Sequence, residues 1–391
     1  MNVTNVSTVN DVNEAASGVA LAEPARPVHP PIQALVPSAL RDMSARMLRL
    51  YQEVLPGAPT VVDGEPRAVP DGEGPTERLA TPAFAKLGEI AVNQGPISGI
   101  LASTDGGHLA VTNHAANCVS VIDTSTFAVI ATIGGTEEPF AIAGGGADDS
   151  HAYVSTVSAD YDSISVIDTD THAVVATHPV ALSVQDLAVS PDGKRLYASR
   201  TGLDGTDVIV IDASADRVKA IDVATGEGVS AGTLCLSPDG RRLYVATVNS
   251  RGSDVVVIDT RKERVVATIE VGLPIRGVAL SPDSRTAYIA SCDPALGGVV
   301  DVIDTLTHRV TDTVKIGGSP TQLTISSGGK WAYVVSDDQI TVLCTATKEV
   351  IDAIAVESGP SCVAESADGK QLFVADHAGG VTVLSLVAPT I

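Results

Sequence analysis

Two histidines of this chain occupy the same position in a sequence unit that recurs along it. His114 and His377 each lie eleven residues after the first residue of their unit, Asp376 precedes His377, and Asp337 holds the equivalent position one unit before the last. Imidazole and carboxylate groups bind transition metals and transfer protons, so these four residues are candidates for a metal site or for general acid/base catalysis. This requires a fold that brings the first and last units together. The sequence shows no short-range ligand spacing, and solvated loop histidines are the favoured alternative.

The element that must position these residues is a repeat. Each unit begins with Ser-Pro-Asp-Gly or a variant, continues with a short apolar run, and ends with Val-Ile-Asp-Thr and a second apolar run. The units begin 40 to 47 residues apart, at Ser103, Gly146, Ser190, Ser237, Ser281, Ser326 and Ser366. Seven residues later stand Ala110, Tyr153, Tyr197, Tyr244, Tyr288, Tyr333 and Phe373. Aromatic and β-branched runs favour strands and Asp-Gly favours hairpin turns, so each unit predicts the four strands of a β-propeller blade.

The two ends of the repeat region are predicted to meet. The last unit stops at residues 381–384, its third strand, while residues 87–92 precede the first unit and match a fourth strand elsewhere, residues 266–271. We expect residues 87–92 to complete the last blade, because an open ring would expose two sheet edges. The predicted fold is therefore all-β, a seven-bladed β-propeller over residues 84–391 with four-stranded antiparallel blades and an N-terminal strand that closes the last blade.

Two strings of the repeat carry a family resemblance. Leu243-Tyr244-Val245-Ala246-Thr247 and Leu109-Ala110-Val111-Thr112-Asn113, with the recurring Ser-Pro-Asp-Gly, resemble the YVTN family of seven-bladed propellers. The resemblance covers roughly residues 84–391 and implies that fold. Proteins of this family and its relatives include surface-layer, periplasmic and cytoplasmic binding proteins, and similar sheets occur in lactonases and redox enzymes. Because function depends on the loops that the fold carries, the resemblance assigns no activity.

The connections between second and third strands are predicted to build a site. They are long at 155–163, 199–207, 247–254 and 291–299, and short at 336–339 and 376–380. We expect a protein partner or small ligand on the rim formed by the long loops of blades 2 to 5, or in the channel mouth. The predicted binding residues are charged residues of these loops and polar residues of the innermost strands: Asp160, Arg200, Asp204, Asp293, Asp186, Arg276 and Gln322. An ion pair between Asp186 and Arg276 is one interpretation, and a water-filled structural channel is the favoured alternative.

The composition limits the partners and the compartment. The formal net charge of −22 argues against nucleic acid and anionic membrane surfaces as partners. The five cysteines are scattered without a CxxC pair, so no disulfide framework is expected. The N-terminus lacks the features of a signal peptide, and no stretch of 18 apolar residues occurs, so we expect a cytoplasmic protein without membrane insertion.

The first 83 residues are predicted to form a separate, largely disordered extension, because they are polar and rich in proline and glycine. Within it, residues 38–54 carry an apolar stripe at helical spacing, formed by Leu40, Met43, Met47 and Tyr51. This pattern predicts one amphipathic helix. A helix that packs on its own propeller is the favoured interpretation, and a docking helix for another protein is the alternative.

The expected function is non-enzymatic. Residues 228–232 fit the pattern GxSxG, but they join two blades instead of forming a strand-to-helix turn, so no catalytic residue is predicted, and no cofactor is expected. The hypothesis is a binding or scaffold propeller that presents its long-loop rim to a protein or small ligand. The alternative is a lactonase-like hydrolase or metal-dependent enzyme that uses His114, His377, Asp337 and Asp376.

Overall fold

The structure is a computed structural model, and it describes residues 83–146, 150–157, 161–180, 183–212, 217–226, 228–356 and 359–387. These residues all belong to one compact unit, Glu77–Ile391. The predicted extension up to residue 82, with its helix at 38–54, lies outside the described residues. Within the described ranges, no helix has the length and hydropathy needed to cross a membrane.

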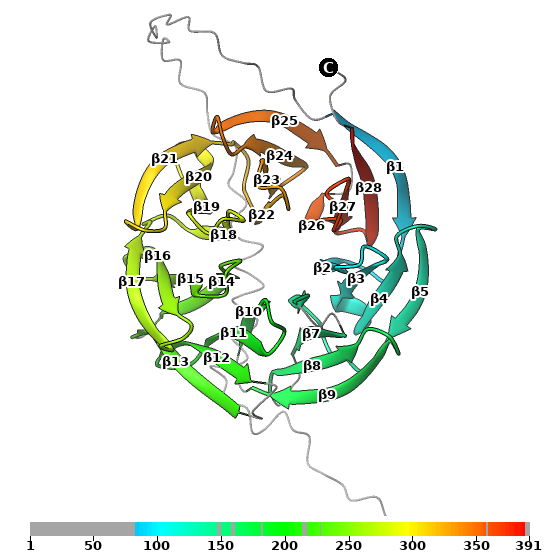
Figure 1. The fold of residues 1–391 in the computed structure, drawn as a ribbon, viewed down its shortest axis with the longest axis horizontal. Coiled ribbons are helices and arrows are strands. Elements are labelled where there is room, and N and C mark those ends of the chain that lie inside the picture. The colour runs from blue at the N-terminus through cyan, green and yellow to red at the C-terminus, as the bar shows by residue number, and fades with distance from the viewer. Residues whose placement is uncertain are drawn as a thin grey trace, which may run out of the picture. The chain divides into compact units, whose positions relative to one another are not determined.

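The strands form seven four-stranded antiparallel sheets, which confirms the predicted fold. Figure 1 shows the sheets around a central axis, with first strands such as β10 and β14 innermost and β13 and β17 on the outside. Blade 1 contains β2 (Ile97–Ala102), β3 (His108–Asn113), β4 (Cys118–Asp123) and β5 (Ala128–Ile133), and blade 2 contains β6 (Ile142–Gly144), β7 (His151–Thr156), β8 (Ser163–Asp168) and β9 (Ala173–Pro179). Blade 3 contains β10 (Val184–Val189), β11 (Arg195–Thr201), β12 (Gly205–Asp212) and β13 (Arg217–Thr225), and blade 4 contains β14 (Ser230–Leu236), β15 (Arg242–Asn249), β16 (Gly252–Asp259) and β17 (Arg264–Glu270).

The remaining blades follow the same order. Blade 5 contains β18 (Ile275–Leu280), β19 (Thr286–Asp293), β20 (Gly297–Asp304) and β21 (Arg309–Lys315), and blade 6 contains β22 (Gln322–Ile325), β23 (Trp331–Ser336), β24 (Gln339–Cys344) and β25 (Glu349–Ala355). Blade 7 contains β26 (Pro360–Glu365), β27 (Gln371–Asp376), β28 (Gly380–Val387) and β1 (Ala83–Ala91). A short 3-10 helix, η2 (His114–Ala116), joins β3 to β4.

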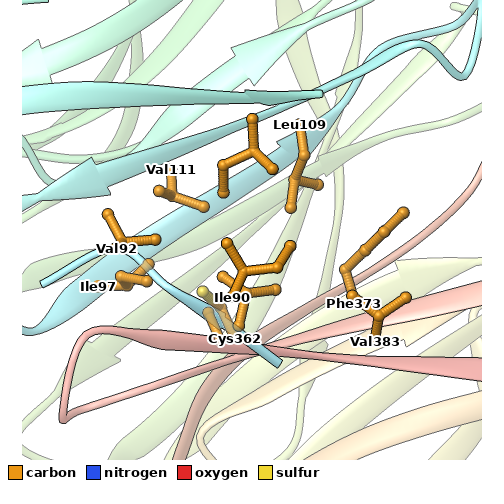
Figure 2. Packing of buried hydrophobic residues seen from close by; sticks show 11 residues of the cluster. Ile90, Val92, Ile97, Leu109, Val111, Cys362, Phe373 and Val383 are labelled. Carbon is orange, nitrogen blue, oxygen red and sulfur yellow. The ribbon is translucent and has the colours of Figure 1, made fainter. Parts of the chain in front are cut away.

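Strand β1 closes the ring, as the sequence predicts. It pairs antiparallel with β28, with Ile90 opposite Val381 and Glu89 opposite Thr382. Figure 2 shows Ile90 and Val92 in a buried cluster with side chains of blade 7, such as Phe373, and of blade 1. The first described strand therefore completes the last blade and also fills its interface with the first.

The repeated Ser and Asp positions are turn residues. In the first turn of blade 1, the Ser103 hydroxyl donates to Asp105 Oδ1 at 2.6 Å, and the Gly107 amide donates to the same oxygen at 2.8 Å. Ser237 and Asp239 repeat this contact in blade 4. The aspartate of Val-Ile-Asp-Thr accepts amide hydrogen bonds from the turn that follows it, as Asp304 does from Thr307 at 2.7 Å. These side chains satisfy backbone donors that turns leave unpaired.

The aromatic position of the repeat fills the space between blades. Tyr244 of blade 4 packs against Ile275 and Ile289 of blade 5, and Tyr333 of blade 6 packs against blade 7. Tyr197, Tyr244, Tyr288, Tyr333 and Phe373 are all at most 4% exposed. Burying a side chain of this size contributes about 1.5–3 kcal/mol, so this position is a main source of blade stacking.

The predicted long loops of blades 3 to 5 are largely paired strand. Strands β15, β16, β19 and β20 each have 8 residues, whereas β23 and β24 of blade 6 have 6 each. In blade 4, for example, the pairing of β15 with β16 extends to Asn249 opposite Gly252. The raised side of the rim therefore consists of hairpins that project beyond the sheets, and their backbones are held by ladder hydrogen bonds.

Candidate functional site

The two aspartates considered as metal ligands accept hydrogen bonds from backbone amides. Asp376, 3% exposed, accepts hydrogen bonds at Oδ1 from the amides of Ala378 and Gly380, both at 2.8 Å. Asp337 Oδ2 accepts from the Ser319 amide at 3.2 Å. Asp376 thus holds the turn between β27 and β28, and Asp337 connects the turn of blade 6 to the segment that enters this blade.

The two imidazoles are placed differently from each other. His114 lies in η2, and its Nδ1 is buried without a hydrogen-bond partner among the described residues. His377 lies in the turn between β27 and β28, and its amide donates to Gly359 O at 3.2 Å. In the ranges that the structure describes, no group of three or more His, Cys, Asp or Glu side chains is arranged to hold a metal ion. The structure therefore does not assemble the four residues into the predicted set.

Two of the predicted channel residues connect neighbouring blades. Asp186 on β10 of blade 3 accepts from the Thr233 hydroxyl at 2.7 Å and from the Leu234 amide at 2.9 Å, both in blade 4. Gln322 on β22 of blade 6 accepts from the Val363 amide of blade 7 at 2.8 Å. Burial raises the pKa of Asp186, and these hydrogen bonds oppose the shift. Such side chains pair otherwise unsatisfied groups of the next inner strand, which is a structural role.

The ion pair between Asp186 and Arg276, one interpretation of the sequence, does not occur among the ion pairs of the described residues. The Asp186 carboxylate instead accepts from Thr233, from Leu234 and from the adjacent Leu187 amide. Arg276 lies half-buried on β18. The spacing of the repeat identified both residues as inner-strand positions but could not show that Asp186 points along the ring toward blade 4.

The four predicted binding residues of the loops have different surroundings. Arg200 forms a two-point ion pair with Asp207, with Nε to Oδ1 at 2.8 Å and Nη2 to Oδ2 at 2.6 Å, and it also donates to Val180 O. Asp293 accepts from the amides of Ala295 and Leu296, so it shapes the tip of its hairpin. Asp204 is exposed at the tip of blade 3. Asp160 lies outside the described residues.

The rim of blades 2 to 5 carries exposed apolar side chains that the sequence analysis missed. Tyr161 is 51% exposed, Leu203 66%, Val248 38% and Leu296 45%. Each comes from a different blade, at or beside the connection between its second and third strands. Phe140, 38% exposed, lies in the connection from blade 1 to blade 2 on the same rim. On the opposite rim, Leu306 is 88% exposed, and Val175, Val218 and Val310, near the starts of the outer strands that begin there, are 54%, 61% and 46% exposed.

A cavity of about 330 Å³ lies between blades 1 and 2, toward the opposite rim. Its floor is apolar and includes Leu101, Ala110, Val121 and Ile167. His108, His151 and His172 line it together with the exposed Asp105 and Asp170. The rings of His108 and His172 meet edge to face, with centroids 6.0 Å apart.

The sequence contained a signal for this cavity that was not used. Ala110 is the only small residue at the repeat position that otherwise carries Tyr or Phe. Ala152, which faces it across the interface, is also small. The space that an aromatic ring fills in the other interfaces is therefore open here.

The fold and its two rims define a seven-bladed β-propeller protein. The chain is 42% identical over 364 residues to the seven-bladed beta-propeller protein Rv1057 of Mycobacterium tuberculosis, with 85% of this chain and 92% of that protein covered. It therefore belongs to the same family of seven-bladed β-propeller proteins.

Other comparisons concern the fold alone. No family model matches the chain, so the YVTN likeness stays a resemblance. Among solved structures, the hydrazine synthase of Kuenenia stuttgartiensis is similar, with a TM-score of 0.67, 22% identity, and 77% of this chain and 98% of that chain covered. At this identity the likeness transfers no chemistry.

Proposed function

We propose that this chain is a non-catalytic binding protein that receives a protein partner on the rim of blades 2 to 5. The observation that carries the proposal is the row of exposed apolar side chains at the tips of consecutive blades. Tyr161, Leu203, Val248 and Leu296 each stand on a separate blade of one side of the ring. Exposed apolar residues gathered on one face are typical of protein interfaces, and tyrosine is enriched among residues that dominate binding energy.

The supporting scaffold is rigid enough to present these residues. The hairpins of blades 3 to 5 are paired nearly to their tips, and the Arg200–Asp207 ion pair lies close to the tip of one of them. A preorganised surface loses little conformational entropy on association. This favours a partner with a fixed surface of its own.

The charge of the chain indicates the chemistry of the partner. Asp204 and Asp293 border the apolar tips, and the formal net charge is −22. Complementary charge accelerates association and excludes wrong partners. We propose a partner whose apolar patch is bordered by lysine or arginine, and neither nucleic acid nor an anionic membrane fits this requirement.

The proposal is tested by site-specific photocrosslinking of the full chain in cells that naturally produce it. A photoreactive phenylalanine derivative is placed at position 203 or 296 on the proposed rim, and at position 306 on the opposite rim as the matched control. We expect the same discrete crosslinked protein from positions 203 and 296 and its absence from position 306. A second copy of this chain as the crosslinked species would instead identify a self-association surface.

The variant Leu203→Ser provides the second control. It should weaken the crosslink from position 296, because both side chains contact one partner, while thermal unfolding stays unchanged for an exposed position. Identical crosslinking patterns from both rims would overturn the proposal.

A further inference from the structure

The cavity between blades 1 and 2 is a defined vacancy in a repeated pattern. Six of the seven units place Tyr or Phe at the position of Ala110, and five of these rings are at most 4% exposed between blades. Where the unit carries Ala110, a cavity of about 330 Å³ lies in the interface. An engineered apolar cavity of about 150 Å³ is enough to bind benzene. The space therefore admits one aromatic ring and a substituent.

The polar end of the missing side chain also has a counterpart in the interface. The Thr305 side chain of blade 5 interacts with the Tyr244 hydroxyl and opposes the burial that raises the pKa of this phenol, and Thr345 of blade 6 does the same at Tyr288. Each threonine ends a Val-Ile-Asp-Thr string or its variant in the next blade. Two of the interfaces thus bring a phenol to this threonine, whereas in another the Tyr333 hydroxyl donates to Glu365 Oε1 at 3.3 Å.

Thr169 is the equivalent threonine of blade 2, and it lines the cavity. Its amide donates to Ser150 O at 2.9 Å, as the Thr305 amide does to Arg285 O at 3.0 Å, so its backbone keeps the common register. The Thr305 hydroxyl donates its proton to Ser284 O, and its oxygen can still accept from the Tyr244 hydroxyl, because a hydroxyl group is both a donor and an acceptor. A hydroxyl oxygen has two acceptor lone pairs, so the Thr169 oxygen can accept from a bound hydroxyl in addition to the contacts that it already makes.

The negative charge at the mouth of the cavity favours a neutral ligand over an anionic one. Asp105 and Asp170 are exposed there. The hydrogen bond from the Ser103 hydroxyl, with help from the Gly107 amide, lowers the pKa of Asp105, so this carboxylate is ionised at neutral pH. An anionic ligand such as a phenolic acid would be repelled at short range, whereas a neutral phenol would not.

From these observations, we propose that the cavity between blades 1 and 2 binds a small neutral phenol, whose ring occupies the place of the missing tyrosine and whose hydroxyl donates to Thr169. The apolar walls from Leu101, Val121 and Ile167 contact the ring. The imidazoles of His108 and His172 border the mouth, where a ring substituent can reach them. This site lies on the opposite rim from the proposed protein surface and is independent of it.

The test uses p-cresol, which is the tyrosine side chain cut at Cβ. Its binding to the full chain is measured by calorimetry and by NMR of the alanine methyl groups. We expect saturable binding with stoichiometry of one that shifts the methyl resonance of Ala110. Toluene, which lacks the hydroxyl, should bind about fivefold more weakly, the effect of one neutral hydrogen bond. The anion 4-hydroxybenzoate should bind more weakly than p-cresol.

Two variants separate this site from nonspecific binding. Ala110→Phe restores the ring of the other blades, so it should abolish p-cresol binding while the thermal midpoint is maintained or raised. If this variant does not fold, Thr169→Val keeps the cavity and should remove the preference for p-cresol over toluene. Leu203→Ser, on the protein rim, should leave p-cresol binding unchanged, which keeps this result distinct from the test of the proposed function.

The outcomes decide the proposal in both directions. Loss of binding in a folded Ala110→Phe variant, or loss of the p-cresol preference in Thr169→Val, supports it. Absence of saturable binding to the unaltered chain, equal binding of p-cresol and toluene to it, or undiminished binding to a folded Ala110→Phe variant overturns it.

Discussion

Closure of the ring by β1 makes a quantitative prediction at Ile90. This side chain is 3% exposed, and it packs against Val381 and Val383 of β28 and against side chains of blade 1. Ile90→Ala removes buried methyl and methylene groups from a cluster that two blades share. Such truncations in well-packed cores cost about 2–5 kcal/mol, and we expect the upper half of this range, because strands of two different blades would have to move together to close the gap.

Leu87 offers a control on the same strand. It is 49% exposed and lies at the irregularity in pairing between Lys86 and Gly88, so Leu87→Ala should cost less than about 1 kcal/mol. Both variants are unfolded in urea with the full chain, and the free energy of unfolding is extrapolated at a common slope. Equal destabilisation by the two substitutions would refute the argument that β1 is a packed part of the last blade.

Two further predictions concern contacts that recur around the ring. Gln322→Leu should lower the free energy of unfolding by about 1–3 kcal/mol, because the buried Val363 amide loses its acceptor. Gln322→Glu keeps an acceptor and should cost less. Urea unfolding of both variants measures the two costs, and equal costs would contradict the prediction. In the turn of blade 7, the hydrogen bond from Ser366, followed by contacts from Lys370, lowers the pKa of Asp368 to about 2 from an ordinary 3.8. A depressed pKa in the folded state contributes stability above pH about 4 that is lost as the pH falls toward 2. Ser366→Ala should move the pKa of Asp368 up toward its ordinary value, as measured by carboxyl NMR titration, and an unchanged pKa would show that Lys370 dominates.

The repeat predicted most of the architecture because it is periodic. Seven equivalent origins fix the number of blades, and a missing fourth strand at the C-terminus together with a spare strand at the N-terminus leaves one way to close the ring. The turn role of residues such as Asp304 also follows from the sequence, since a short carboxylate after a strand accepts the amides of its turn.

The details of the rim did not follow, because counting residues between strands does not show whether they pair. The connection at 247–254 looked like a loop, yet Val248 lies opposite Ser253 in a continuous hairpin. Gly252, with φ of 143°, allows the tight reversal at its tip. The direction of an inner-strand side chain was equally hidden, as the contact of Asp186 with blade 4 shows.

The cavity presents a different limitation. An alanine at a position that otherwise carries an aromatic ring does not by itself predict a cavity, since a larger residue on the facing blade could fill the space. Here the facing residue is Ala152, and both interface positions are small. An aromatic side chain is needed at every interface between blades only if every interface must be close-packed and free of water. A chain that omits one ring gives up a stabilising contact at that interface, while five of the other interfaces keep a ring that is at most 4% exposed.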